Sequence, residues 1–323
     1  MAKRRIVLAM LGLVAAAAAG CGPARDEQAL QHTGLGHAYL AQNKLDEALQ
    51  EFEDAVQLDP KLGIAQARVG DIERERGNYE KAIEPYKMAI ALLPGEFDTW
   101  YNLGTVYRVL GRHQEAVQSY QGAAEIRPQN VPTRMDMSFC YFELKQYDAA
   151  LEQSQKAVEL APDNASAWSN LGALYYMTDK TWDAIAAYKK ALELNADQPA
   201  ALINLGTLYL EQGRKDEAVE ALKKALAIDP DNAEIHYRLG IAYNKLARYN
   251  VAIERLDRCI ELNPKHYEAM NALGGIYVWY YKKDTNQVDF LKKGLQHWNA
   301  SLELNPRQAH IVAMAAKWSK ELK

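Results

Sequence analysis

Long hydrophobic runs are nearly missing from this sequence. The longest apolar stretch without a charge extends from Ile6 to Ala19, about 14 residues, whereas a helix that spans a bilayer needs about 20. No other segment approaches that length, so the sequence predicts no membrane-spanning helix.

Residue patterns typical of enzymes and metal sites are also missing. There is no Cys-x-x-Cys, no His-Glu-x-x-His, no Gly-x-Ser-x-Gly and no phosphate-binding glycine loop. The seven histidines are scattered, and His32 and His37 lie five residues apart instead of the four that put two ligands on one helix face. We therefore expect no catalytic residues, no metal site, no cofactor and no enzymatic activity.

Excess positive charge is absent as well. The whole chain has 38 basic and 42 acidic residues, and residues 1–20 hold three of the basic and none of the acidic ones. Residues 21–323 therefore have 35 basic and 42 acidic side chains, a net charge of −7. This balance argues against a nucleic-acid partner and against electrostatic docking on anionic lipid.

What the sequence contains is a period of 34 residues. Glycine, alanine, tyrosine and proline each recur at this spacing or twice this spacing: Gly36, Gly70, Gly104, Gly172, Gly206, Gly240 and Gly274; Ala48, Ala82, Ala116, Ala150, Ala184, Ala218 and Ala252; Tyr39, Tyr107, Tyr141, Tyr175, Tyr209, Tyr243 and Tyr277; Pro60, Pro94, Pro128, Pro162, Pro230 and Pro264. Between these marks leucine and alanine stand three and four apart, which predicts two short helices joined by a tight turn in each unit.

The repeated pattern resembles the tetratricopeptide repeat family. The residues that carry the match are Trp100-x-x-Leu103-Gly104-x-x-Tyr107, followed by Ala116, Tyr120, Ala123 and Pro128, and the match extends over about nine-tenths of the chain. The resemblance implies an all-α, right-handed superhelical solenoid of about eight helix-turn-helix repeats with a C-terminal capping helix. We place the repeats at 29–62, 63–96, 97–130, 131–164, 165–198, 199–232, 233–266 and 267–308, and the capping helix at 309–323.

Several positions depart from the repeat. Glu73 replaces the aromatic residue of the second repeat, Ser138 and Ser154 replace a glycine and a large residue of the fourth, and Ala196 replaces a closing proline. The eighth repeat holds eight additional residues around Trp279, which we interpret either as a longer cap or as a partner-specific loop. Three repeats separate Cys140 from Cys259, so we expect no disulfide between them.

The N-terminus reads as a signal peptide over residues 1–20, with a basic start and then the apolar stretch. Ala18-Ala19-Gly20-Cys21 resembles the lipobox of bacterial lipoproteins, which implies lipidation of Cys21 and a lipidated tether over 21–28. The alternative is an ordinary signal peptide cleaved after residues 17–19, with Cys21 incidental. In the lipoprotein reading, Gly22 after the cysteine implies anchoring in the outer membrane of the cell envelope, facing the periplasm.

The resemblance also indicates where a partner protein would bind. Side chains at fixed positions of each first helix face the concave groove of the family's superhelix, and here they include Tyr101, Asn102, Thr105, Arg108, Met135, Phe139, Phe142, Asn170, Tyr176 and Asn204. We expect an aromatic cluster of Phe139, Phe142 and Tyr176 that binds a peptide or helix with apolar anchors. The alternative is that these side chains fill the inner wall against neighbouring first helices.

Two functions compete. The first is a lipid-anchored scaffold or adaptor, without enzymatic activity, that mediates protein–protein interactions in the bacterial cell envelope. The second is a pilotin-like assembly factor for a type IV pilus or secretion system. A repeat module that regulates an enzyme by covering its surface is a third interpretation.

Overall fold

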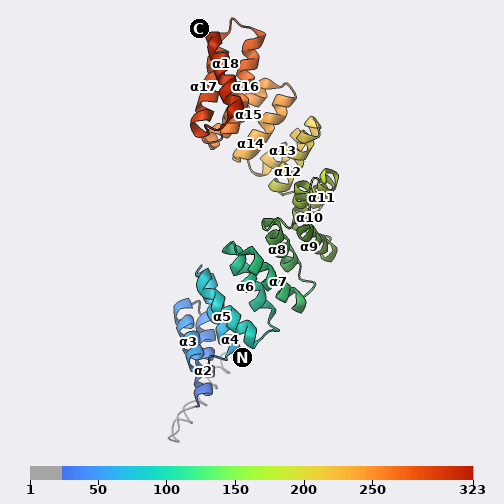
Figure 1. Cartoon of the computed structure of the whole chain (residues 1–323). Coiled ribbons are helices and arrows are strands. Elements are labelled where there is room, and N and C mark those ends of the chain that lie inside the picture. The colour runs from blue at the N-terminus through green and yellow to red at the C-terminus, as the bar shows by residue number, and fades with distance from the viewer. Residues whose placement is uncertain (1–23, 323) are drawn as a thin grey trace. The chain divides into compact units, whose positions relative to one another are not determined.

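The chain folds as a series of paired helices. The computed structural model describes residues 24–322, and this part contains seventeen α-helices, one short 3-10 helix and no strand (Figure 1). The all-α class is confirmed, whereas the right-handed superhelix stays a prediction. The expected signal peptide, Cys21 and the start of the tether lie outside the described residues.

The helices belong to two compact units, one ending at Leu160 and the other beginning at Ala161. The first unit contains α2 (Arg25–Leu40), α3 (Leu45–Leu58), α4 (Gly63–Glu75), α5 (Tyr79–Leu92), α6 (Phe97–Val109), α7 (His113–Ile126), α8 (Val131–Glu143) and α9 (Tyr147–Leu160). The second contains α10 (Ala165–Met177), α11 (Thr181–Leu194), α12 (Pro199–Glu211), α13 (Lys215–Ile228), α14 (Ala233–Lys245), α15 (Tyr249–Leu262), α16 (Tyr267–Lys283), α17 (Val288–Leu304), α18 (Ala309–Ser319) and η2 (Lys320–Leu322).

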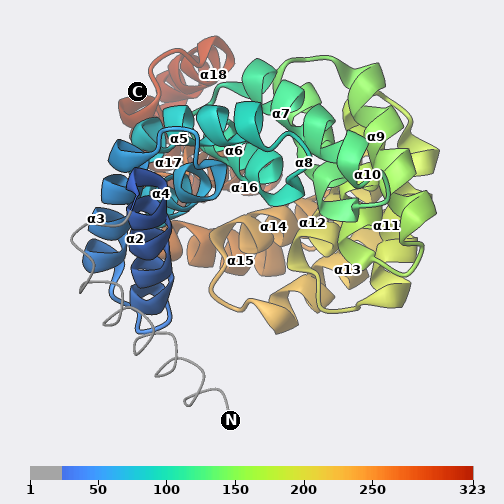
Figure 2. The ribbon, with the colours of Figure 1, turned by 90° about the horizontal axis from the view of Figure 1, so that it is seen from below.

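Consecutive helices pair, as α2 with α3 in the first unit and α14 with α15 in the second (Figures 1 and 2). The first helix begins at Arg25, inside the segment expected to be a tether, and Asp26 and Glu27 in its first turn suit the positive end of a helix dipole. No helix among residues 24–322 is both long and apolar enough to cross a membrane.

The periodic glycines let the two helices of a pair approach closely. A Cβ placed on Gly104 would lie 2.7 Å from the ring of Tyr120, which is fully buried in the facing helix. Gly36 faces Phe52 and Gly70 faces Tyr86 in the same way. The small residue of the first helix and the large residue of the second therefore form one interlocking contact per repeat.

The departures of the second and fourth repeats leave their helix pairs intact. Ser138 and Ser154 are both buried, and the Ser138 hydroxyl donates to the Ala150 carbonyl at 2.8 Å across the pair. Helices α8 and α9 keep 13 and 14 residues, the lengths found in α6 and α7. Glu73 is also buried and accepts a hydrogen bond of 2.7 Å from Asn78 Nδ2.

The additional residues of the eighth repeat lengthen helices. Helices α16 and α17 each have 17 residues, compared with 13 in α14 and 14 in α15. Trp279 lies inside α16, where its ring centroid is 4.0 Å from that of Tyr249. Of the two interpretations of the insertion, the structure favours the longer cap over a loop.

Cys140 and Cys259 are buried and form no disulfide among the described residues. Burial raises the pKa of the Cys140 thiol to about 12, so it stays protonated at neutral pH. Within residues 24–322 no three His, Cys, Asp or Glu side chains are grouped to hold a metal ion.

Candidate partner-binding surface

The first helices of the first unit carry a polar network centred on Asp71. The Asp71 carboxylate, on α4, accepts hydrogen bonds from the Tyr86 hydroxyl at 2.9 Å, from Asn102 Nδ2 at 3.0 Å and from Arg68 Nη1 at 2.6 Å. Arg74 Nε in turn donates to the Tyr86 hydroxyl at 3.3 Å. Burial, and then the charge of Asp71, raise the pKa of Tyr86, so this phenol remains a neutral donor.

A second network joins α6 to α8 through Asp136. The Tyr101 hydroxyl donates to Asp136 Oδ2 at 2.7 Å, and Arg108 Nε lies 3.6 Å from Asp136 Oδ1. Thr105 Oγ1 donates to the Tyr101 carbonyl and lies 3.3 Å from the Tyr120 hydroxyl. Burial and the hydrogen bond to Asp136 raise the pKa of Tyr101, and burial raises that of Tyr120 to about 12.

Phe139 on α8 is a large apolar residue that is exposed to solvent next to these networks. Its side chain is 44% exposed, although its ring is held on two sides. The His113 ring meets it edge-on at a centroid distance of 6.0 Å, and the Arg108 guanidinium lies 5.8 Å from its centroid. An exposed aromatic ring with fixed neighbours provides a pre-ordered apolar contact.

Phe142 and Met135, also on α8, are only half-buried. The Phe142 ring packs on Tyr147, at the start of the next helix, with a centroid distance of 5.8 Å. Phe142 therefore contributes to the helix pair α8–α9 as well as to the surface.

In the second unit two of the three predicted residues also contact neighbouring helices. The Tyr176 hydroxyl donates to Glu211 Oε1 at 2.7 Å, and Asn204 Nδ2 donates to the Tyr188 hydroxyl at 3.0 Å. The hydrogen bond to Glu211 raises the pKa of Tyr176. Asn170 is exposed and makes no hydrogen bond to a described residue.

These contacts bear on two expectations about the surface. The predicted binding residues Asn102, Asn170 and Asn204 stand at one repeat position. Asn102 is hydrogen-bonded to Asp71 and Asn204 to Tyr188, so two of these three asparagines already have partners inside the fold. The expected aromatic cluster draws Phe139 and Phe142 from the first unit and Tyr176 from the second, and each ring has partners within its own unit. The binding role of these residues stays a prediction.

Sequence reasoning missed Asp71 and Asp136, which organise the two networks. The signal was present, because Asp71 stands at the same repeat position as Phe139, and Asp136 at the same position as Asn102. A carboxylate among apolar and amide side chains at these positions indicates a partner donor, because a charge near the fold interior needs one.

Comparisons with known proteins extend over most of the chain. Residues 63–273 match the family of the cilia and flagella-associated protein 70 C-terminal domain, and residues 29–62 match the tetratricopeptide repeat family. No curated protein matches this chain.

Solved structures share the fold at low sequence identity. The C-terminal part of a repeat protein from Cytophaga hutchinsonii has 17% identity and a TM-score of 0.61, with 76% of this chain and 98% of that chain covered. The pilF protein of Pseudomonas aeruginosa has 20% identity and a TM-score of 0.54, with 62% and 92% covered. YrrB, described as a tetratricopeptide protein with an unusual peptide-binding site, has 22% identity and a TM-score of 0.50, with 58% and 96% covered.

The family matches together extend from residue 29 to residue 273. Over this range the structure consists of helix pairs, and in every pair except α8–α9 a glycine interlocks with a large side chain. The chain belongs to the tetratricopeptide repeat family.

Proposed function

We propose that this protein is a lipid-anchored adaptor of the bacterial cell envelope, which binds another protein through the first helices of its first unit. The observation that carries the proposal is Phe139, an apolar ring that is 44% exposed and fixed between Arg108 and His113. Such a ring is suited to an apolar anchor of a peptide or helix. YrrB, a protein of the same fold, is itself described as having a peptide-binding site.

The surroundings of Phe139 favour a partner segment that offers both an apolar side chain and hydrogen-bonding groups. Arg108 presents positive charge beside the ring, while Asp136 lies 3.6 Å from its Nε atom and Asp71 is held by three donors in the neighbouring network. An apolar side chain of the partner would pack on the Phe139 ring, while the polar backbone on either side of it would reach the charged groups of these networks.

Photo-crosslinking in intact cells tests this surface. A photoreactive residue at position 139 should give one dominant protein adduct, which mass spectrometry would identify. Met88 on α5 is the matched control, because it is 43% exposed but lies on a second helix. Equal adducts from 139 and 88, or none from 139 in a folded and lipidated protein, would contradict the proposal.

Phe139→Ala should reduce partner capture at least about tenfold, because interface anchors of this type contribute more than about 1.4 kcal/mol. The free energy of unfolding should fall by less than about 1 kcal/mol, since the ring is only partly buried. Phe142→Ala should cost more stability because it loses the contact with Tyr147. Denaturant titration beside a pull-down separates the two effects, and a large loss of stability in Phe139→Ala would place that ring in the core instead.

The proposed anchor rests on Cys21 and the apolar stretch before it. Cys21→Ser should abolish metabolic incorporation of labelled fatty acid and release the protein from the membrane fraction. Retention of the label in this variant would exclude Cys21 as the modified residue.

The pilotin-like role is the alternative within the same proposal. The identity of the adduct at position 139 separates the two: a secretin or pilus component indicates the pilotin, and a cell-wall enzyme or its regulator indicates the adaptor.

A further inference from the structure

A recurring contact ties each of five repeats to the end of the one before it. The fourth residue of a repeat donates from its side chain to the carbonyl oxygen of the preceding closing proline, across different residue types. The pairs are Gln66 with Pro60 at 3.5 Å, Trp100 with Pro94 at 2.9 Å, Arg134 with Pro128 at 3.1 Å, Trp168 with Pro162 at 2.9 Å, and His236, by an Nε2 contact, with Pro230 at 3.0 Å.

The sixth repeat lacks both partners of this contact. Its fourth residue is Leu202, which has no donor, and the preceding proline is replaced by Ala196. No described side chain donates to the Ala196 carbonyl oxygen. Leucine is also smaller than the tryptophan that occupies this position in the third and fifth repeats.

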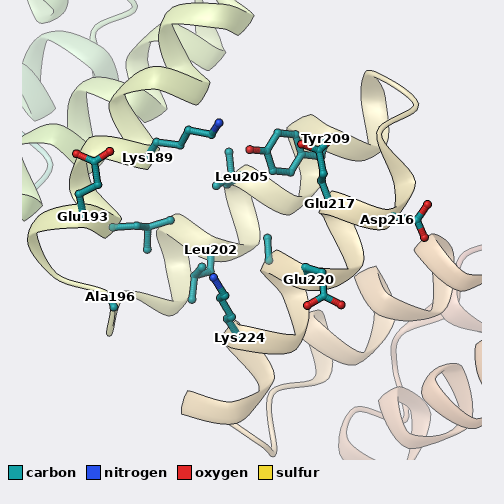
Figure 3. A pocket seen from close by; sticks show the side chains of 12 residues that line it. Lys189, Glu193, Ala196, Leu202, Leu205, Tyr209, Asp216, Glu217, Glu220 and Lys224 are labelled. Atoms are coloured by element: carbon teal, nitrogen blue, oxygen red, sulfur yellow. The ribbon is translucent and has the colours of Figure 1, made fainter.

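A groove of about 540 Å³ is present at this junction, between α11, α12 and α13 (Figure 3). Leu192, Leu202, Leu205 and Ala221 line its apolar part, and charged side chains of α11 and α13 stand along its edges. Ala196, whose carbonyl accepts no hydrogen bond from a described side chain, also lines this groove. The apolar space stands where the third and fifth repeats have a tryptophan, so the groove suits an indole ring and its N–H donor.

The same helix α11 presents an exposed tryptophan. Trp182 is 70% exposed, the highest value among the large hydrophobic side chains of residues 24–322. At its position the six other repeats of regular length have polar residues, namely Asp46, Glu80, Gln114, Asp148, Asp216 and Asn250. Four residues later, where those repeats have Gln50, Glu84, Gln118, Glu152, Glu220 and Glu254, this one has the exposed Ala186. The outer face of α11 has therefore lost polar groups at two neighbouring positions.

Trp182 and the groove lie along one face of α11. Lys189 and Glu193, which line the groove, follow Trp182 by seven and eleven residues, so all three point in nearly the same direction. At 1.5 Å per residue the groove begins about 10 Å along the helix from the tryptophan. An indole and a groove on one face, separated along the helix, form a self-complementary surface under a two-fold axis.

Charges along α11 suit an antiparallel pairing of two copies. An axis beside Ala186, whose small side chain allows close approach, would place Trp182 of each copy opposite residues 189–193 of the other. The same register brings the exposed Asp183 of each copy near the exposed Lys190 of the other, because both residues lie on one flank of α11. A parallel pairing would instead place like charges together.

We propose that the protein forms a two-fold symmetric homodimer in which Trp182 of each copy enters the Leu202 groove of the other. The indole N–H donates to the Ala196 carbonyl, as those of Trp100 and Trp168 do to Pro94 and Pro162. The dimer would present two copies of the partner-binding surface, and it does not depend on the function proposed above.

Sedimentation equilibrium of the full chain carrying Cys21→Ser, which prevents association through lipid, tests the dimer. The parent chain should dimerise, and Trp182→Asp should raise the dimer dissociation constant roughly 100-fold or more, because each dimer loses two buried indoles. Leu202→Trp should have a similar effect by filling the groove from within. Val312→Asp changes a residue that is 47% exposed on α18 and should leave the dissociation constant unchanged.

Mixing the two deficient variants gives a sharper result. Trp182→Asp keeps the groove and Leu202→Trp keeps the exposed tryptophan, so the mixture can form one of the two contacts and should associate more tightly than either variant alone. Even a weak dimer has a dissociation constant of about 100 μM or less. A parent chain that is monomeric at about this concentration would overturn the proposal. Binding of N-acetyltryptophanamide to that monomer, lost in Leu202→Trp, would assign the groove to a tryptophan of another protein and would equally overturn the homodimer.

Discussion

At the scale of single residues, this fold depends on matched pairs of small and large side chains. Gly274 lies against Trp298, which is buried and donates from Nε1 to the Asn271 carbonyl at 3.2 Å. Gly275, the next residue of the same helix, has open space where a Cβ would be. A side chain at residue 274 would therefore clash with Trp298, whereas a side chain at residue 275 would meet no other atom.

Alanine substitution at these two positions should have effects of opposite sign. Gly274→Ala forces a methyl group into the Trp298 ring and should lower the free energy of unfolding by about 1–3 kcal/mol. Gly275→Ala meets nothing and should raise it by about 0.5–1 kcal/mol through helix propensity. Urea titration followed by circular dichroism measures both, and a stabilising Gly274→Ala would refute the interlocking contact.

The fourth repeat shows what the sequence did and did not reveal at this scale. The sequence shows Ser138 and Ser154 as two separate departures from the repeat. Ser138 stands at the glycine position and Ser154 at the large-residue position of the interlocking contact. A larger residue on one helix is thus matched by a smaller one on the other, and both are buried. Helices α8 and α9 keep their length because the two substitutions compensate each other in side-chain volume. Comparison of one position at a time does not show this compensation.

At the scale of elements, the turn inside each of the first seven repeats uses one left-handed residue. Its positions recur every 34 residues with φ between 57° and 76°: Asn43, Gly77, Gly111, Lys145, Asp179, Gly213 and Ala247. A backbone N–H one residue later bonds the carbonyl five residues back, as from Arg248 to Tyr243 at 2.9 Å. This closure caps the first helix and starts the second.

Ala247 is the least suitable of these turn residues, because its side chain is strained at φ 58° and offers no local hydrogen bond. Ala247→Gly should therefore raise the free energy of unfolding by about 1 kcal/mol. Gly213→Ala, at φ 74° in the equivalent turn, is the reverse control and should destabilise by a similar amount. Shifts of the urea midpoint in the same direction for both variants would argue against turn strain as the cause.

The eighth repeat marks the limit of periodicity as a guide to elements. The period located eight additional residues but could not assign their conformation. The rings of Tyr277 and Tyr280 lie 6.2 and 5.2 Å from that of Phe290 on α17, so aromatic contacts continue the helix pair beyond its usual length. Tyr277 belongs to the recurring tyrosines, but Phe290 lies near the start of the lengthened α17 and has no place in the recurring series, which is why spacing did not predict these contacts.

At the scale of the whole molecule, repeated helix pairs were predictable and the polar networks were not. Spacing identified the helix pairs because the recurring glycines, alanines and tyrosines perform the same packing task in most repeats. Asp71 and Asp136 each occur once and join helices of neighbouring repeats, so only the structure shows that Asn102 and Tyr101 are engaged with them. The same holds for the groove beside Leu202, which arises from two changes in different repeats.

Each repeat in such an array is stabilised by its interfaces with the two adjacent repeats. The C-terminal cap should therefore affect the local stability of only the repeats close to it. Gln308 joins the cap to α17 by hydrogen bonds, beside the apolar packing of Ile311 and Trp318 on that helix. Its buried Nε2 donates to the Ser301 carbonyl, the Ser301 hydroxyl and the Asn305 carbonyl at 3.1, 2.9 and 2.9 Å, and its Oε1 accepts from Asn271 Nδ2 at 2.5 Å. Removal of this amide leaves acceptors at the end of α17 without a donor.

Gln308→Ala should destabilise the cap by about 2 kcal/mol, which increases amide hydrogen exchange in α17 and α18 by roughly 30-fold. Exchange in α4–α7 of the first unit should remain unchanged, because nearest-neighbour coupling fades over the intervening repeats. Arg307→Ala, one residue earlier and exposed, provides the control and should alter neither region. Mass spectrometry of exchanged peptides resolves the helices separately, and a uniform rise along the chain would mean that the two units unfold as one cooperative body.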